Sequence, residues 1–242
     1  MNLWKSKGLI CLLILTGVLL LSCSGPAPGK DLDGAALLKE SIETMAQLNS
    51  YGVNASVETY GEDSDRRLAL LQATITYHRS PFAYSNLQEL SAVSEDATQP
   101  DTQFTFYLFA KENNVYLFNS LTGLWNRDDS EAVNQNVASL ANIFGSFDSE
   151  EFQDVKITKE QDDKATLEGK TSGSAFLYNL MQSFDSGLTG TFTAVINTQT
   201  KHMESFTYIC PTDTGREEID LMIKDFNQAA EVVIPSSALE AE

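Results

Sequence analysis

The chain has 242 residues, 42% of them hydrophobic, which is enough for one large β-rich domain with its own core. Its 34 acidic and 16 basic residues give a formal net charge of −18. Nucleic acids and anionic lipid surfaces are bound through basic patches, so this balance argues against either as a partner of the globular part. We interpret the acidic excess as a solvated surface that keeps an exported protein soluble.

The first 25 residues have the pattern of a bacterial lipoprotein signal. Lys5 and Lys7 precede an apolar run from Gly8 to Leu21, and a small residue stands directly before Cys23. The run is shorter than the roughly 20 residues that a membrane-spanning helix needs, which argues against an uncleaved anchor. We therefore predict a signal peptide over residues 1–22 and lipidation of Cys23, whose acyl chains would tether the protein to a membrane outside the cytoplasm.

The rest of the chain is expected to hold one domain. Residues 23–33 comprise the lipidated cysteine and a short linker that contains Pro26 and Pro28. The domain is then expected over residues 34–235, with an acidic tail over 236–242.

The cysteines predict no disulfide within the monomer. Cys11 lies in the signal and Cys23 is expected to carry lipid, which leaves Cys210 without a partner. Cys210 follows Phe206 and Tyr208 at strand spacing, so we expect a buried thiol more than a reactive one.

One amphipathic helix is expected first, from Gly34 to Asn49. Apolar residues recur there at spacings of three and four, and Asp33 is placed to cap the helix. Alternating apolar and polar residues then predict an antiparallel series of strands, which supplies a sheet for the helix to cover. The expected strands are 53–57, 71–77, Phe82–Leu90, Phe104–Lys111 and Val115–Trp125, with a tight turn at Asn113-Asn114 before the last.

Two of these strands, Phe104–Lys111 and Val115–Trp125, carry large apolar residues on both faces, so each side needs a cover. Two later amphipathic helices are the candidates, and Gly145 and Gly187 are placed to end them. Their stripes are Val133, Val137, Leu140, Ala141 and Phe144 in the first and Leu177, Leu180, Met181 and Phe184 in the second. Further strands are expected at Phe152–Lys159, Ala165–Thr171, Leu188–Asn197, Met203–Cys210 and Glu218–Phe226.

This order of elements resembles the curved half-barrel of the LolA-like and RseB-like superfamily of bacterial envelope lipid-binding proteins. It is more closely similar to an uncharacterised family of extracytoplasmic lipoproteins of LolA-like type. The likeness is carried by Cys23, by the stretch from Leu37 to Tyr51 that leads into the first strand, and by Phe226-Asn227 with Val232–Pro235 near the end. The resemblance implies an α+β fold in which a curved antiparallel sheet forms a half-barrel, with about three helices packed on its concave face.

The same resemblance implies a hydrophobic concave surface that accepts the acyl chains of lipids or lipoproteins, or senses them for a regulatory partner. The candidate lining residues come from the helix stripes and the doubly apolar strands. An ordinary core role stands open beside the ligand-binding role for each of them, because stripes at helical spacing usually pack against a sheet. The candidates are Phe104, Phe106, Trp125, Leu140, Phe144, Leu180, Met181 and Phe184.

The chemistry of an enzyme is not indicated, and the resemblance implies no catalytic residues. His78 and His202 are far apart and have no neighbouring ligands at metal-binding spacing. Nucleophile-elbow, phosphate-loop and dinucleotide motifs are absent. The acidic pairs around Asp31 and Asp63 lack the remaining ligands of a calcium loop, and we interpret them as turn and capping residues. We predict no metal, no cofactor and no enzymatic activity.

Two functions remain open. The first is a lipid-anchored extracytoplasmic protein that holds a hydrophobic ligand, such as a lipid or a lipoprotein acyl chain, in a half-barrel cavity. The second is an interaction or sensor module with a filled core, which docks a protein partner of the cell envelope through its acidic surface or a sheet edge. The first requires an accessible apolar cavity, whereas the second requires none.

Overall fold

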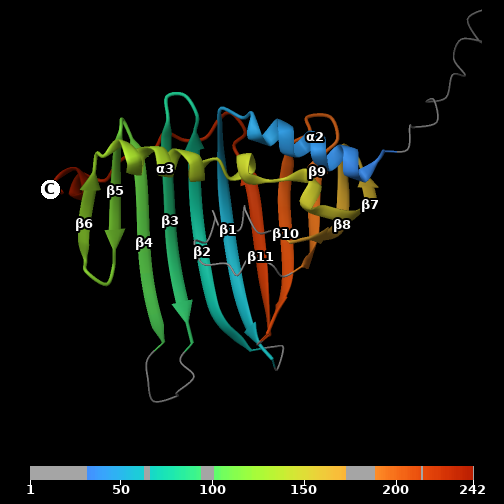
Figure 1. Ribbon diagram of the computed structural model, residues 1–242, viewed down its shortest axis with the longest axis horizontal. Helices are drawn as coiled ribbons and strands as arrows, with labels where there is room; N and C mark the ends of the chain where they lie inside the picture. Colours follow the sequence, from blue (N-terminus) through green and yellow to red (C-terminus); the bar gives the residue numbers. More distant parts are fainter. Residues whose placement is uncertain (1–31, 63–65, 94–100, 173–188, 214, 242) are drawn as a thin grey trace, which may run out of the picture. The chain divides into compact units, whose positions relative to one another are not determined.

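The computed structural model describes residues 32–62, 66–93, 101–172, 189–213 and 215–241. Asp33–Glu242 is one compact unit. Its described residues form one curved, unclosed sheet of eleven antiparallel strands, with the two longer helices packed against one face (Figure 1). The predicted α+β half-barrel is confirmed.

The described residues form eleven strands, three α-helices and two 3-10 turns. The strands are β1 (Ser50–Gly61), β2 (Arg67–His78), β3 (Ala83–Ala92), β4 (Thr102–Lys111), β5 (Asn114–Asn119), β6 (Leu124–Asp128), β7 (Phe152–Gln161), β8 (Lys164–Thr171), β9 (Gly190–Asn197), β10 (Met203–Thr212) and β11 (Gly215–Lys224). The helices are α2 (Gly34–Ala46), α3 (Glu131–Ala141) and α5 (Ser236–Leu239), with 3-10 turns η1 (Ile143–Ser146) and η2 (Ser149–Glu151).

The first and last strands meet in the middle of the sheet. The strand order is β6-β5-β4-β3-β2-β1-β11-β10-β9-β8-β7, so β1 pairs with β2 on one side and with β11 on the other. The pairing of β1 with β11 runs from Gly52 opposite Lys224 to Gly61 opposite Gly215. We call this pairing the seam, because it joins two series of strands that are each consecutive in the sequence.

The main core lies on the sheet face that carries α2, α3 and η1, which we call the inner face. On β1 every second residue from Tyr51 to Val57 is buried against this core. The register repeats the pattern on the neighbouring strands, since Val53 lies opposite both Ile75 and Ile223. The alternation of the sequence therefore continues across the seam.

Helix α2 begins where the sequence predicted. The Asp33 carboxylate accepts hydrogen bonds from the backbone N–H groups of Ala35, at 3.0 Å, and Ala36, at 3.4 Å, so the predicted cap is confirmed. The helix ends at Ala46, where the guanidinium of Arg79 donates to the Ala46 carbonyl and to Gln47 Oε1. Its buried stripe packs on the inner face and consists of Leu37, Leu38, Ile42 and Met45.

The break between α3 and η1 is held by a buried hydroxyl of the sheet. Tyr51 Oη donates to the Ala141 carbonyl at 3.4 Å and accepts from the Ile143 N–H at 3.1 Å. These two backbone groups lie where the helix stops, and burial makes an unpaired polar group costly there. Burial also raises the pKa of the Tyr51 hydroxyl. The sequence stripe ending at Phe144 therefore divides between α3, which ends at Ala141, and η1.

The opposite, outer face is covered in part by residues 227–239, which we call the strap. Asn49 N–H donates to Asn227 Oδ1 at 2.8 Å, and Lys111 Nζ lies 2.9 Å from Glu231 Oε1. The strap then buries Val232 and Ala238 in a second core with Ala83, Phe109 and Tyr116. Apolar residues on both faces of β4 and β5 are thus explained by α3 on one side and the strap on the other.

Several sequence expectations need correction. The single strand expected over Val115–Trp125 is two strands, because the chain turns between Asn119 and Leu124, with Gly123 at φ +66°. The turn before β5 is centred on Glu112 and Asn113, which both have positive φ, one residue earlier than expected. Part of the segment expected as a tail, Ser236–Leu239, forms α5 beside β5 and β6. The helix expected around Leu177–Phe184 lies outside the described residues.

Candidate functional site

A hollow of about 230 Å³ opens on the inner face. Figure 1 shows α2 and α3 along the end of the sheet where β1 begins. The hollow lies toward the other end of β1, and its walls come from β1, β2, β3, β4 and β11. It is lined by Val57, Thr59, Ala69, Leu71, Gln88, Leu90, Phe104 and Glu217.

The floor of this hollow is an apolar row that runs across five strands. The row is built by register: Val57 lies opposite both Ile219 and Leu71, Leu71 opposite Leu90, and Leu90 opposite Phe104. Leu71, Leu90 and Phe104 are half-buried, unlike the core side chains nearer the helices. The described part of the inner face therefore presents a partly uncovered apolar surface beside a filled core.

Three polar side chains lie beside the apolar row. Thr59 and Glu217 lie opposite each other at the seam, and Gln88 lies on β3. Glu217 is half-buried, and this burial raises the pKa of its carboxyl above the ordinary value. The hollow thus combines an apolar floor with a few hydrogen-bonding groups, which is the usual composition of a small-molecule site.

A larger groove of about 660 Å³ lies on the outer face, beside the strap. Tyr107, Phe118 and Trp125 form its aromatic floor, with ring centroids 5.5 Å apart for the first pair and 5.3 Å for the second. Polar residues of β2 and β3 line one side of the groove, and strap residues line another. The lining is Gln72, Ala73, Thr74, Leu87, Glu89, Tyr107, Phe109, Phe118, Trp125, Pro235 and Ser237.

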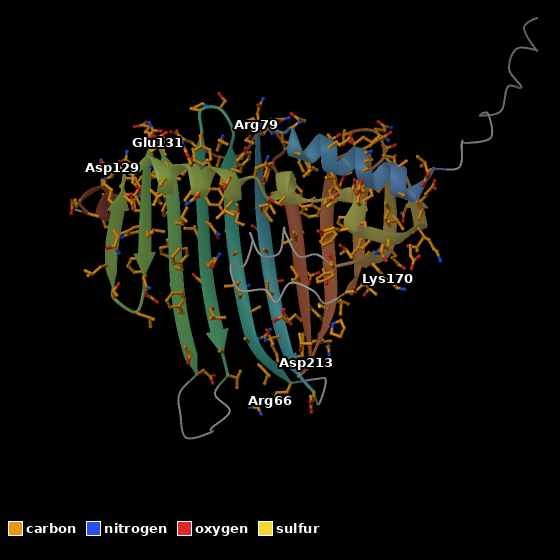
Figure 2. The ribbon with its side chains drawn as sticks, viewed as in Figure 1. Arg66, Arg79, Asp129, Glu131, Lys170 and Asp213 are labelled. Atoms are coloured by element: carbon orange, nitrogen blue, oxygen red, sulfur yellow. The ribbon has the colours of Figure 1, made fainter. Side chains whose placement is uncertain are left out.

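A third hollow lies at the rim, at the start of α3. Figure 2 shows Asp129 and Glu131 near each other there. Two of its amides already have partners, since Asn134 Nδ2 donates to the Asn113 carbonyl at 2.9 Å and Gln135 Nε2 donates to Glu131 Oε1 at 2.9 Å. We interpret this hollow as a solvated rim of the domain.

The eight sequence candidates do not gather in one place. Phe104 lines the inner hollow, and Phe106 lies on the same face. Phe144 is 1% exposed and packs edge-on against Tyr51 at 5.2 Å, within the core. Leu140 is half-buried on α3.

Trp125 is separated from Phe104 and Phe106 because it lies on the outer face. β6 pairs Trp125 with Phe118, which in turn lies opposite Tyr107. The other candidates, Leu180, Met181 and Phe184, lie outside the described residues, as does Cys23.

Most of the inner hollow was not identified from the sequence. Val57 and Leu71 were recognised as strand residues, but nothing in their local pattern distinguishes them from core. Thr59, Gln88 and Glu217 were not singled out by any motif. Only the register across the seam brings Glu217 beside Thr59.

The two histidines of the domain and its cysteine, which could in principle carry chemistry, make contacts that stabilise the fold. His78 Nε2 lies 2.9 Å from the Ala230 carbonyl of the strap, and the His202 ring stacks on Phe226 at 4.4 Å. Cys210 is buried, as predicted, and burial raises the pKa of its thiol. Among the described residues no three His, Cys, Asp or Glu side chains come together to hold a metal ion. The described part of the chain also contains no helix with the length and apolarity needed to cross a membrane.

No protein-family model and no curated protein matches the chain. Among solved structures it is similar to LprF from Mycobacterium bovis, with a TM-score of 0.53 and 12% identity over 85% of this chain and 97% of LprF. A DUF1329 family protein from Desulfovibrio piger aligns with a TM-score of 0.28 and 8% identity, over 83% of this chain and 93% of that one. A beta-barrel-like DUF1849 protein from Brucella abortus aligns with a TM-score of 0.22 and 9% identity, over 76% and 98%. The likeness to LprF shows a shared fold.

Proposed function

We propose that this protein is a lipid-anchored, extracytoplasmic binding protein that holds the apolar part of a lipid, or of a lipoprotein acyl chain, in the inner-face hollow without catalysing a reaction. The observation that carries the proposal is the apolar row across β1 to β4 and β11, whose members on β2, β3 and β4 are half-buried. These three side chains, Leu71, Leu90 and Phe104, remain partly accessible beside a filled core that includes Val57 and Ile219. Covering apolar surface of this kind with an acyl chain removes it from water, which favours binding.

The size of the hollow agrees with this use. An engineered apolar cavity of roughly 150 Å³ is known to bind benzene, so about 230 Å³ accepts a segment of an acyl chain. Among the described lining residues only Glu217 is charged. Such a lining favours an uncharged apolar segment over an ionic ligand.

A second candidate function is the docking of an envelope protein or the sensing of one. The observation that favours it is the outer-face groove, which is larger than the inner hollow and carries the aromatic rings typical of interface centres. The two candidates place the ligand on opposite faces of the sheet, so paired variants distinguish them.

Leu90→Trp should abolish lipid binding, because the larger ring fills the hollow from its floor. The matched control is Leu87→Trp, which changes a half-buried leucine of the same strand on the outer face. Residues 24–242 are used, since Asp33–Glu242 is a compact unit with its own core. Each chain is incubated with phospholipid vesicles, separated from them and examined by native mass spectrometry for bound lipid.

We expect lipid on the unaltered chain and on Leu87→Trp, but not on Leu90→Trp. Circular dichroism and thermal unfolding confirm that both variants fold. Loss of lipid from Leu87→Trp alone would place the ligand in the outer-face groove. If no lipid is found on the unaltered chain or on either variant, the result would count against the binding function and favour the docking function.

The anchor gives a separate prediction about covalent mass. In the protein purified from membranes with detergent, we expect the chain to begin at Cys23 and to carry a diacylglyceryl group. The Cys23→Ala variant should retain residues 1–22 and show no acyl mass, because the acceptor thiol is missing. Intact-protein mass spectrometry measures both. A chain that begins elsewhere, or an unmodified Cys23, would contradict the anchor.

A further inference from the structure

We propose that Glu217 makes the inner-face hollow selective for amphiphiles whose polar group is an uncharged hydrogen-bond donor, such as a hydroxyl, and against free fatty acid carboxylates. This inference rests on the proposed function, because it concerns the polar group of a ligand bound in that hollow. Its basis is the placement of one carboxylate at the end of an apolar floor, without a basic side chain among the described lining residues.

The register fixes where Glu217 lies. It pairs with Thr59 across the seam and with Cys210 on the other side. It stands two residues before Ile219, so both project onto the inner face, and Ile219 belongs to the apolar row. Ile219 itself is fully buried, so a ligand chain would lie over the open part of the row, from Phe104 toward Val57. Its end would then come near Glu217 and Thr59, which line the same hollow.

The two strand arginines near Glu217, Arg67 and Arg216, pair with other side chains. Arg67 Nη1 lies 3.4 Å from Glu58 Oε1, and Arg216 Nε lies 2.7 Å from Glu218 Oε1. The Arg216 guanidinium also lies 4.1 Å above the ring of Tyr60. Glu58 and Tyr60 alternate with Thr59 along β1, and Arg216 and Glu218 alternate with Glu217 along β11, so these four residues lie on the outer face. Arg67 of β2 pairs with Glu58 on that face.

Arg66 does not line the hollow either. Its carbonyl accepts from the Gly61 N–H at 3.3 Å, and Figure 2 shows Arg66, together with Asp213, at the end of the sheet where β1 finishes. The described lining residues therefore contain no cation to neutralise a ligand carboxylate.

The chemistry of Glu217 then decides which polar group fits. An ionised carboxylate only accepts hydrogen bonds, so a ligand hydroxyl that donates to it is favoured and a second carboxylate is repelled. Thr59 and Gln88 can both donate and accept, and so tolerate ester or hydroxyl oxygens. Burial raises the pKa of the Glu217 carboxyl, which agrees with partial exclusion of water and hence with weaker screening of a facing charge.

The test compares two ligands with the same acyl chain, monodecanoylglycerol and decanoate. Binding to residues 24–242 is measured by isothermal titration calorimetry at pH 8, where decanoate is ionised. We expect the glyceride to bind about tenfold more tightly or better, which corresponds to about 1.4 kcal/mol. Glu217→Gln should reduce the preference to about twofold, mainly through tighter decanoate binding.

The control is Glu218→Gln, which removes the same charge from the next residue, on the outer face. It should leave the preference unchanged. Equal binding of the two ligands by the unaltered chain, or the same loss of preference in both variants, would overturn the role of Glu217 while leaving the lipid-binding function intact. Failure of both ligands to bind at all would instead count against the proposed function.

Discussion

Replacing Phe144 by alanine should lower the free energy of unfolding by about 3–5 kcal/mol. The side chain is 1% exposed, and its ring lies 5.2 Å from that of Tyr51 and 5.5 Å from that of Phe147. Its removal leaves a cavity at the point where η1 meets the sheet. Urea unfolding followed by circular dichroism measures the change.

A matched control for this substitution is Phe118→Ala. Phe118 is half-buried on the outer face, where solvent can fill the space that the ring leaves. We expect a clearly smaller loss of stability there. If Phe144→Ala instead kept the stability of the unaltered chain and lost lipid, Phe144 would belong to a ligand-binding surface and not to the core.

Gly190→Ala should destabilise the domain strongly, by about 1–3 kcal/mol or more, through overpacking. A Cβ at this position would lie 2.3 Å from the Ile209 carbonyl oxygen and 2.7 Å from the Tyr208 ring. The ring is held in place because Tyr208 Oη donates to the Thr171 carbonyl at 3.3 Å. Neither the backbone oxygen nor the ring can withdraw without opening the pairing of β9 with β10.

Gly61→Ala provides the comparison. The nearest atom to a Cβ at Gly61 would belong to the Leu68 side chain, at 3.5 Å, which is ordinary contact. The melting temperatures of the two variants should therefore differ. That of Gly61→Ala should lie near the value for the unaltered chain, and that of Gly190→Ala well below it. Equal melting temperatures would show that the sheet accommodates a methyl group beneath Tyr208.

The sequence predicted individual helices and strands better than it predicted which segments pack against them. Asp33 identified the start of α2, and strict alternation identified β1, β2 and β8 to β11, because both signals are local. The turn between β5 and β6 was missed because the apolar residues on either side of Gly123 read as one continuous strand. The strap was missed as a cover because it has little periodicity of its own; its docking depends on Val232 and Ala238 meeting the outer side of β4 and β5.

The candidate site was predicted less well, for a physical reason. A half-barrel places the core and the candidate ligand surface on the same face. Neither the helical spacing that included Phe144 nor the strand pattern that included Phe104 therefore separates the two. The difference arises from which strands extend beyond the helices, and this depends on strand lengths and register. Trp125 was assigned to the cavity as part of a strand expected to carry large apolar residues on both faces, whereas the missed turn before β6 determines which face it occupies.

The seam has a consequence for how the chain finds its fold. β1 to β6 and β7 to β11 are each meanders in which neighbouring strands are also neighbours in sequence, so their contacts are local. The pairing of β1 with β11 is the single long-range closure between them among the described strands, and α2 reinforces it by lying against β7 and β10 of the other meander. Because non-local pairing is what slows folding, we expect each meander to organise early and the closure of the seam to set the overall rate.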